Sequence, residues 1–193
     1  MIRRARILWD LDDTLNPLMR SWLEWAGQQM DKSALPPYSK IRRNPPHQLI
    51  GITLEEYLVS LDRFRQSTEA ACMPVESNVL EWFNTQGHRF EHHVLTARPH
   101  ATVHAAAEWV FRNLGEWIRH FHFVPALRPG VALPDAGASK ASMIKQLGGF
   151  DYFLDDTEQN LSGINEYVGR CFLVPQPWNC QSLTLSQILK KIQ

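Results

Sequence analysis

Acidic side chains stand at the end of the first apolar run of the chain. The run Ile7–Trp9 is followed at once by Asp10, and Asp12 comes two residues later. Ionised carboxylates are costly to bury without partners, so acids that end a buried strand need a cation or hydrogen-bond donors close by. In open α/β sheets, ligands bind outside the carboxyl ends of the strands. The segment therefore indicates either a strand that delivers carboxylates to a metal or phosphate site, or a strand followed by an acidic turn.

Four further polar residues are placed like these acids. Thr96 follows one later apolar run, Asp155 and Asp156 follow another, and Lys140 stands at the start of a predicted helix. Parallel strands bring their carboxyl ends to one edge of a sheet. Clustered carboxylates suit Mg²⁺, which prefers oxygen ligands, and a metal with a Lys offsets charge on a transferring phosphoryl group. One carboxylate can attack phosphorus while another moves a proton, so the set predicts phosphoryl transfer.

The elements that must position these groups alternate between strand and helix. We expect strands at 5–9, 90–95, 121–124, 152–154 and 171–174, and helices at 18–30, from 53 onward, and at 76–86, 100–114, 140–147, 157–167 and 182–192. Ser139 can cap the helix that begins at Lys140, and Gly148 and Gly149 can end it. Such alternation predicts an α/β protein with a mostly parallel sheet that is covered on both faces.

Residues 17–73 have helical periods and no strand period. Thr53 and Glu56 have the spacing of a capping box at the start of a helix, whereas the prolines of 31–46 indicate a loop. We therefore expect a small helical insertion between two parts of a core, 1–16 and 74–193. Trp22 and Trp25 in the insertion either stack on a base or sugar or, as we expect, pack in the core.

Composition excludes several classes of function. The 193 residues suit one domain, or one domain with an insertion. Basic and acidic residues number 20 each, which argues against nucleic acid as a partner. No apolar run approaches the roughly 20 residues of a membrane span. Three scattered cysteines form neither a disulfide framework nor a zinc spacing, and the basic start lacks a signal peptide's apolar segment. We expect a cytoplasmic protein; its oligomeric state is left open.

Histidines crowd the middle third of the chain. His100 and His104 are four residues apart, a spacing that can bind zinc on a helix. No acidic or cysteine partner completes a recognisable motif around them. We therefore expect surface and helix-end histidines, with a transition-metal site as the alternative.

Taken in order, the motifs resemble those of the haloacid dehalogenase-like (HAD) phosphatase superfamily. The segment Asp10–Leu15, DLDDTL, is similar to the first motif, DxDxT, and Val94–Thr96 resembles the second. Lys140 stands where the third motif has its lysine. Phe153–Asp156 resembles the fourth motif, an acidic pair after a hydrophobic strand. The resemblance covers nearly the whole chain, with all four motifs in order.

The resemblance implies a Rossmann-like core with a C1-type cap at 17–73, and a Mg²⁺-dependent phosphomonoester hydrolase that works through an aspartyl-phosphate. Asp10 would be the nucleophile and a metal ligand. Asp12 would be the general acid/base, and its backbone carbonyl would also bind metal. Thr96 and Lys140 would bind the phosphoryl group; Lys145 is a second candidate, but it lies deeper in its helix.

The resemblance assigns Mg²⁺ binding to the pair Asp155 and Asp156. Asn160 stands four residues after Asp156, as the second acid does in one variant of the fourth motif, which slightly favours Asp156 as the direct ligand. Arg98 either binds a substrate phosphate or carboxylate or forms a structural ion pair. Asp13, where members often have Gly, is interpreted as a turn residue.

The resemblance also bears on the substrate. The presence of Asp12 favours phosphomonoester hydrolysis over dehalogenation. The cap, the segment Leu95–Arg98 and the segment Gln176–Asn179 are together similar to the 5'-deoxyribonucleotidase-like branch, which suggests a small phosphorylated metabolite such as a (deoxy)nucleotide. The alternatives are a sugar-phosphate or phosphotyrosine phosphatase, a phosphotransferase or mutase, and a binding protein without turnover.

Overall fold

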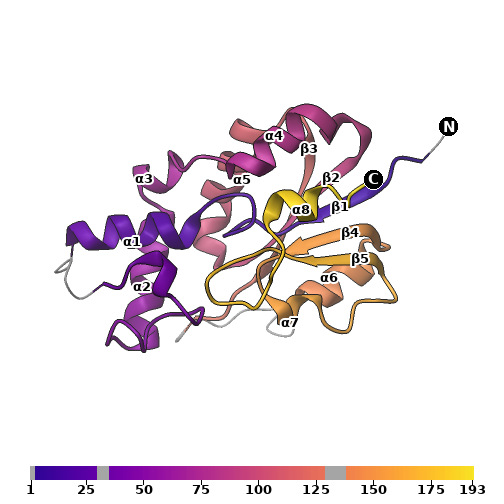
Figure 1. Cartoon of the computed structure of the whole chain (residues 1–193). Coiled ribbons are helices and arrows are strands. Elements are labelled where there is room, and N and C mark those ends of the chain that lie inside the picture. Colours follow the sequence, from indigo (N-terminus) through magenta and orange to yellow (C-terminus); the bar gives the residue numbers. More distant parts are fainter. Residues whose placement is uncertain (1–2, 30–34, 129–137) are drawn as a thin grey trace.

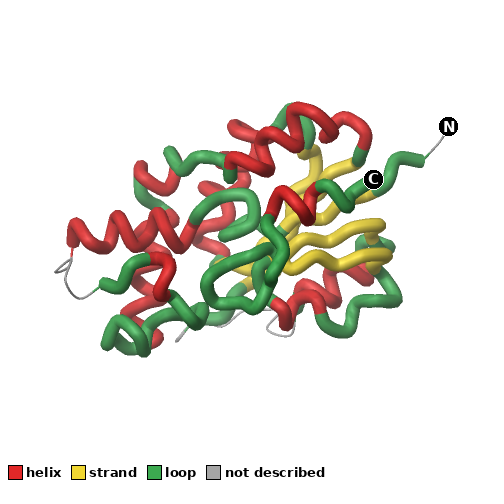
Figure 2. The backbone as a smooth tube through the Cα atoms, in the orientation of Figure 1, coloured by secondary structure: helices red, strands yellow, loops and turns green. Residues whose placement is uncertain are grey.

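A parallel sheet forms the centre of the molecule. A computed structural model of the chain describes residues 3–29, 35–128 and 138–193. Within these residues, five strands form one sheet in the order β3-β2-β1-β4-β5, and every neighbouring pair is parallel (Figures 1 and 2). The α/β fold class predicted from the alternation of elements is therefore confirmed.

The bounds of the elements are as follows. The strands are β1 (Arg6–Trp9), β2 (Glu91–Arg98), β3 (Ile118–Pro125), β4 (Phe150–Asp155) and β5 (Val168–Leu173). The α-helices are α1 (Leu18–Gln29), α2 (Leu54–Arg65), α3 (Thr68–Ala71), α4 (Ser77–Gln86), α5 (Val103–Leu114), α6 (Lys140–Gln146), α7 (Glu158–Leu161) and α8 (Leu185–Leu189). Short 3₁₀ turns cover Tyr38–Lys40, Gly87–Arg89 and His100–Thr102. No helix within the described residues has the length and hydropathy needed to cross a membrane.

The two faces of the sheet pack against different helices, because successive side chains of a strand point to opposite faces. Ile7 and Trp9 of β1 belong to one apolar cluster, which also contains residues of α4, α5 and α8. Leu8, between them, belongs to a second cluster with Ile144 of α6. The sheet is thus covered on both faces, and β1 is buried at its centre, so the acids that follow β1 start from a fixed position.

The segment between β1 and α4 is helical, as its sequence predicts. Helices α1, α2 and α3 gather at one end of the sheet, away from α6 and α7 (Figure 1). The capping box at the start of α2 is present: Thr53 Oγ1 accepts from Glu56 N at 3.1 Å, and Glu56 Oε2 accepts from Thr53 N at 2.8 Å. Trp22 is fully buried and packs edge-on against Tyr57. The prediction that Trp22 packs in the core is therefore confirmed.

The helix that carries Lys140 begins and ends as its sequence predicts. Ser139 accepts from Ser142 N at 3.1 Å and so caps the first turn of α6. Gly148 and Gly149 follow the helix with φ of +77° and +82°. A Cβ on Gly149 would lie 2.5 Å from the Tyr167 carbonyl oxygen, so only glycine fits this turn. These local signals fix where α6 starts and therefore where Lys140 lies.

One predicted helix and two predicted strands differ clearly from the structure. The helix expected at 157–167 ends at Leu161, because Gly163 adopts φ of +72° and Ile164 turns inward to full burial. The strands expected at 121–124 and 171–174 start earlier, at Ile118 and Val168. Both lie at the edges of the sheet, where exposed polar residues interrupt the apolar pattern by which a strand is predicted.

Acidification is expected to destabilise the core through His92. His92 Nδ1 accepts from Trp9 Nε1 at 3.1 Å, and its Nε2 lies 2.7 Å from the Gly87 carbonyl oxygen. This pairing requires the neutral ring, and burial lowers the pKa of His92 to about 4. As the pH falls, His92 is therefore protonated at a higher pH in the unfolded chain than in the folded protein. The resulting stability is fully present above the ordinary pKa of about 6.5 and is lost as the pH falls toward about 4.

The expected loss is about 2 kcal/mol of unfolding free energy between about pH 7 and pH 5. Urea titrations of wild type and His92→Gln would measure it, and the variant should lose less stability over that interval. His88→Gln is the control, because His88 is exposed in the neighbouring turn. An identical pH dependence in wild type and His92→Gln would contradict the assignment.

Candidate active site

The register of the sheet brings Asp10 and Asp155 side by side. Trp9 pairs with Leu154 of β4, and Asp10 N donates to the Leu154 carbonyl oxygen at 2.9 Å. Asp10 and Asp155 each follow these paired residues directly, so both lie at the carboxyl edge of adjacent parallel strands. This is the convergence that the sequence predicts for acids that end apolar runs.

Three buried carboxylates and one buried ammonium lie together at this edge. Oxygens of Asp10, Asp155 and Asp156 all lie within 4.8 Å of one another. Lys140 Nζ donates to Asp10 Oδ1 at 2.5 Å and to Asp155 Oδ2 at 2.6 Å. Lys145 instead lies over the Tyr167 ring, 5.8 Å from its centroid. The structure thus joins Lys140, the lysine preferred from the sequence, to the acids.

The charges in this cluster are not balanced. Burial raises the pKa of Asp10 well above its ordinary value, and Asp155 and Asp156 add to that effect while Lys140 opposes it. Burial, together with Asp155, raises the pKa of Asp156 to about 7. Burial alone would lower the pKa of Lys140, but Asp10 and Asp155 hold it above its ordinary value, so the ammonium stays charged. A second cation would relieve the remaining repulsion, and an all-oxygen donor set suits Mg²⁺.

The two acids at the end of β4 have different partners. The Asp155 carboxylate accepts from Lys140, from Thr157 N at 2.8 Å and from Asn160 Nδ2 at 3.0 and 3.1 Å. The Asp156 carboxylate accepts from Trp178 Nε1 at 2.9 Å and from Thr157 Oγ1 at 3.3 Å. Asp156 therefore keeps more lone pairs for a metal, and its role as the direct ligand stays a prediction. Asn160 itself contacts Asp155.

Asp12 is held by two arginines. Arg98 Nη2 lies 2.7 and 2.8 Å from its two carboxylate oxygens, and Arg65 Nη2 lies 2.8 Å from Oδ2. Burial would raise the pKa of Asp12, but the guanidinium groups of Arg98 and Arg65 outweigh burial and hold it below its ordinary value. Asp12 is therefore ionised in this conformation. Arg98 forms the ion pair that was one of its two predicted roles, and its binding of substrate stays a prediction.

Arg65 was not anticipated from the sequence. It is the last residue of α2, and besides Asp12 it contacts Asp62, which in turn pairs with Arg128. An arginine late in an amphipathic helix gives no local signal of such a contact, because 53 residues separate it from Asp12. The contact ties the helical segment to the motif that follows β1.

Two other residues of the predicted set have defined surroundings. Thr96 is buried near the end of β2, and its Oγ1 accepts from Arg98 Nε at 3.3 Å. Asp13 adopts a positive φ of 58°, as expected of a turn residue where glycine is common. Asp13 also does more than turn the chain, because its Oδ1 accepts from Met19 N at 2.8 Å at the start of α1.

The loop after β5 supports the acids from the other side. Asn179 Nδ2 donates to the Asp156 carbonyl oxygen at 2.9 Å and to the Val174 carbonyl oxygen at 2.8 Å. Gln176 Nε2 donates to the Asp13 carbonyl oxygen at 2.5 Å. With the bond from Trp178 to Asp156, these contacts orient both acidic motifs. The sequence marked this segment only through the resemblance.

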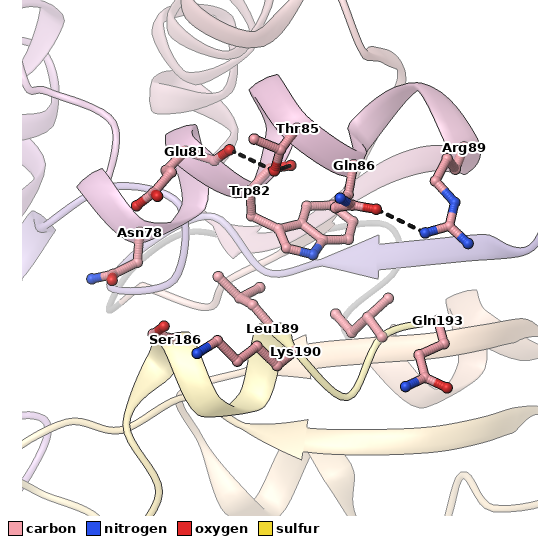
Figure 3. Close-up of a pocket in the computed structure, with 11 residues that line it drawn as sticks. Asn78, Glu81, Trp82, Thr85, Gln86, Arg89, Ser186, Leu189, Lys190 and Gln193 are labelled. Atoms are coloured by element: carbon pink, nitrogen blue, oxygen red, sulfur yellow. Dashed lines mark hydrogen bonds between the residues drawn. The ribbon is translucent and has the colours of Figure 1, made fainter.

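A cavity of about 410 Å³ opens beside Asp156. Its lining includes Trp178 of the supporting loop and Arg42, Arg43 and His47 of the helical segment. Another cavity, of about 360 Å³, lies between α4 and α8 (Figure 3). Arg89, two residues before β2, helps to line that second cavity, and none of the clustered acids does. The first cavity, which Asp156 lines directly, is a candidate to receive a ligand of the acid cluster.

Removing Arg65 or Asp12 is expected to give strongly non-additive effects on stability. Their side chains are 9% and 14% exposed and form a direct ion pair. A double-mutant cycle of Arg65→Gln and Asp12→Asn, followed by urea unfolding, should give a coupling energy of about 1–2 kcal/mol. Arg63→Gln is the matched control, since Arg63 is exposed on the same helix. Equal coupling for Arg63 and Arg65 would show that the pair does not form in solution.

Comparison with known proteins gives matches in structure only. No family model matches the chain, and no curated protein sequence matches it. A haloacid dehalogenase-like family hydrolase from Streptococcus pneumoniae superposes with a TM-score of 0.58 at 11% identity, covering 89% of this chain and 85% of its own. A HAD-superfamily hydrolase of subfamily IA from Geobacter sulfurreducens gives 0.56 at 13%, covering 98% and 97%. A magnesium-bound structure of YfnB from Bacillus subtilis gives 0.50 at 10%, covering 81% and 79%.

Proposed function

We propose that this chain, which has the fold of the HAD-like hydrolases, is a Mg²⁺-dependent phosphomonoester hydrolase. The observation that carries the proposal is the group of three buried carboxylates around Lys140 at the carboxyl edge of the sheet. Such a group is unfavourable for packing alone, because its charges are incompletely paired. It becomes favourable when a cation and a phosphoryl group share the site.

In the proposed reaction, Asp10 attacks the phosphorus of the substrate and the alcohol leaves. Asp12 gives a proton to the leaving oxygen, and Lys140 and Thr96 hold the phosphoryl oxygens. Water then attacks the aspartyl-phosphate, Asp12 takes its proton, and phosphate and free Asp10 result. Lys140 already contacts the carboxylate that is to be phosphorylated. The positive charge of Lys140 is therefore close to the atoms that lose or gain negative charge in the reaction.

The Arg65 and Arg98 contacts bear on the role of Asp12. Because they favour the ionised carboxylate, this conformation suits the second step, in which Asp12 accepts a proton from water. For the first step Asp12 must carry a proton, which the two guanidinium groups oppose. We infer that one of these contacts weakens when substrate enters.

We assign Mg²⁺ binding to Asp10, Asp156 and the backbone carbonyl of Asp12, with Asp155 as the second candidate of its pair. The donor set fits the ion, since Asp10, Asp155 and Asp156 offer only oxygen ligands. When bound, Mg²⁺ would polarise the phosphoryl group and offset the charge of the carboxylates. YfnB, which is similar in fold, binds magnesium in its structure.

We propose residues 17–73 as a cap that shapes the choice of substrate. The cavity beside Asp156 brings Arg42, Arg43 and His47 of this segment close to the acid cluster. The guanidinium groups of Arg42 and Arg43, which line the same cavity as Asp156, suit a small phosphorylated metabolite of the cytoplasm, including a (deoxy)nucleotide with its phosphate toward Asp10.

Phosphate release tests the proposal. Purified protein should hydrolyse an aryl phosphate when Mg²⁺ is present and stop when the ion is chelated. A panel of nucleotides, sugar phosphates and phosphoamino acids should then identify the preferred class. Transfer to an added alcohol instead of water would indicate a phosphotransferase. Mg²⁺ binding without turnover across the panel would contradict the proposal and indicate a binding protein.

A further inference from the structure

A second cluster of metal-ligating side chains lies on the other half of the sheet. Glu91 and His93 of β2 and His120 of β3 each place one ligand atom within 4.8 Å of those of the other two. His93 Nε2 lies 2.7 Å from Glu91 Oε1, and the rings of His93 and His120 stack with centroids 4.1 Å apart. The sequence showed no acidic partner for the histidines. The fold supplies one in Glu91.

The strand register explains why these three residues meet. Glu91 and His93 are two apart on β2, so both side chains leave the same face of the sheet. His93 pairs with His120 on β3, which is an edge strand. His120 is exposed at that edge, whereas the His93 side chain is 4% exposed. The cluster is thus anchored on a buried ring and open to solvent on one side, which gives an ion a path of entry.

The geometry points to a second metal site, formed by Glu91, His93 and His120, that binds a divalent first-row transition metal such as Zn²⁺. Two imidazoles and one carboxylate are a donor set that suits zinc and its neighbours, with an open position for water. Mg²⁺ prefers oxygen ligands alone, so the acid cluster and this site would select different ions. The spacing of His100 and His104, which suggested zinc from the sequence, takes no part.

His122 stands behind the proposed ligands. His93 Nδ1 lies 3.1 Å from His122 Nε2. A hydrogen bond from His93 Nδ1–H to His122 would leave the lone pair of His93 Nε2 free for a metal, as partners of metal-bound histidines commonly do.

One neighbouring cation competes for the site. Arg6 Nε lies 3.5 Å from Glu91 Oε1, so a bound ion would share this carboxylate with a guanidinium. The acid cluster is separate, because Glu91 pairs with Arg6 at the start of β1, and Asp10 lies four residues later, directly after the end of β1. At the rise of a strand, four residues correspond to about 13 Å. The proposed site is therefore independent of the phosphatase proposal.

Metal titration tests the proposal. Protein without a histidine tag is kept in excess Mg²⁺ and titrated with Co²⁺, followed by visible absorption, and with Zn²⁺, followed by calorimetry. We expect one equivalent of each ion to bind and to raise the melting temperature. His120→Ala should weaken binding by more than about ten-fold, and His122→Ala, which removes only the supporting ring, by about ten-fold. Circular dichroism should show both variants folded, since neither residue is fully buried.

Two controls make the result decisive. His104→Ala removes an exposed histidine outside the cluster and should bind the ions like wild type. Asp156→Asn alters the acid cluster and should also keep its transition-metal affinity. The proposal is overturned if wild type shows no saturable binding, if His120→Ala binds as tightly as wild type, or if Asp156→Asn is the variant that loses the ion.

Discussion

Asp10→Asn is expected to abolish phosphate release while leaving the protein folded. The asparagine cannot form the acyl-phosphate, and loss of a covalent nucleophile commonly lowers kcat by roughly 10⁴-fold or more. Folding should tolerate the change, because burial and the neighbouring acids already raise the pKa of Asp10 well above its ordinary value. Asparagine keeps the shape of the side chain and removes one of three clustered negative charges, while Asp155 still pairs with Lys140.

Two measurements separate this role from a structural one. Steady-state hydrolysis of an aryl phosphate gives the loss of activity, and Mg²⁺-dependent shifts in melting temperature report the ion. Wild type should be stabilised by Mg²⁺, and Asp10→Asn less so, because it removes one of the clustered carboxylates. Glu166→Gln, an exposed acid outside the cluster, is the control for both. Near wild-type turnover in Asp10→Asn would rule out the aspartyl-phosphate route.

The acids of the site were predictable because each one directly follows an apolar strand. A strand that is buried on both faces fixes the position of the residue that follows it. Parallel pairing of two such strands is then enough to place Asp10 beside Asp155. Lys140 was predictable for a similar reason, since the Ser139 cap defines where its helix begins. Local signals therefore account for the acid cluster and for the fold class.

The residues that orient the site depend on contacts distant in the sequence. Trp178 reaches Asp156 across 22 residues, and Arg65 reaches Asp12 across 53. Neither residue differs in type or spacing from ordinary core tryptophans or helix-surface arginines. Only the packing of the helical segment and of the last loop against the sheet brings them to the acids, and no sequence period reports that packing.

The histidine cluster and the short helix α7 were missed because tertiary burial overrides local pattern. Polar residues interrupt the apolar pattern of the edge strand β3, so its first three residues were not predicted as strand. The pairing of His120 with His93 was therefore missed as well. In the segment after Asp156, helical propensity continues past Leu161, but Gly163 turns the chain and sends Ile164 into the core. Burying this isoleucine stabilises the turn by about 1.5–3 kcal/mol, more than the helix would gain.

Lys140→Met is expected to be the most destabilising single change at the site. It removes the ammonium that lies 2.5 Å from Asp10 and 2.6 Å from Asp155, and leaves their carboxylates buried without a cation. Breaking a buried ion pair by removing one partner costs about 3–5 kcal/mol. Activity should also fall by about 10²- to 10³-fold, as when one donor to a developing charge is lost.

Mg²⁺ should reverse part of the loss in stability, because it supplies the missing positive charge to the same carboxylates. Urea unfolding with and without Mg²⁺ should therefore show a larger gain for Lys140→Met than for wild type, while turnover stays low. Lys145→Met is the matched control: it lies on the same helix, stacks on Tyr167, and should change stability by less than about 1 kcal/mol. Equal losses of stability in the two lysine variants, or no response of Lys140→Met to Mg²⁺, would mean that Lys140 and a metal ion do not neutralise the same acids. The proposed site would then have to be abandoned.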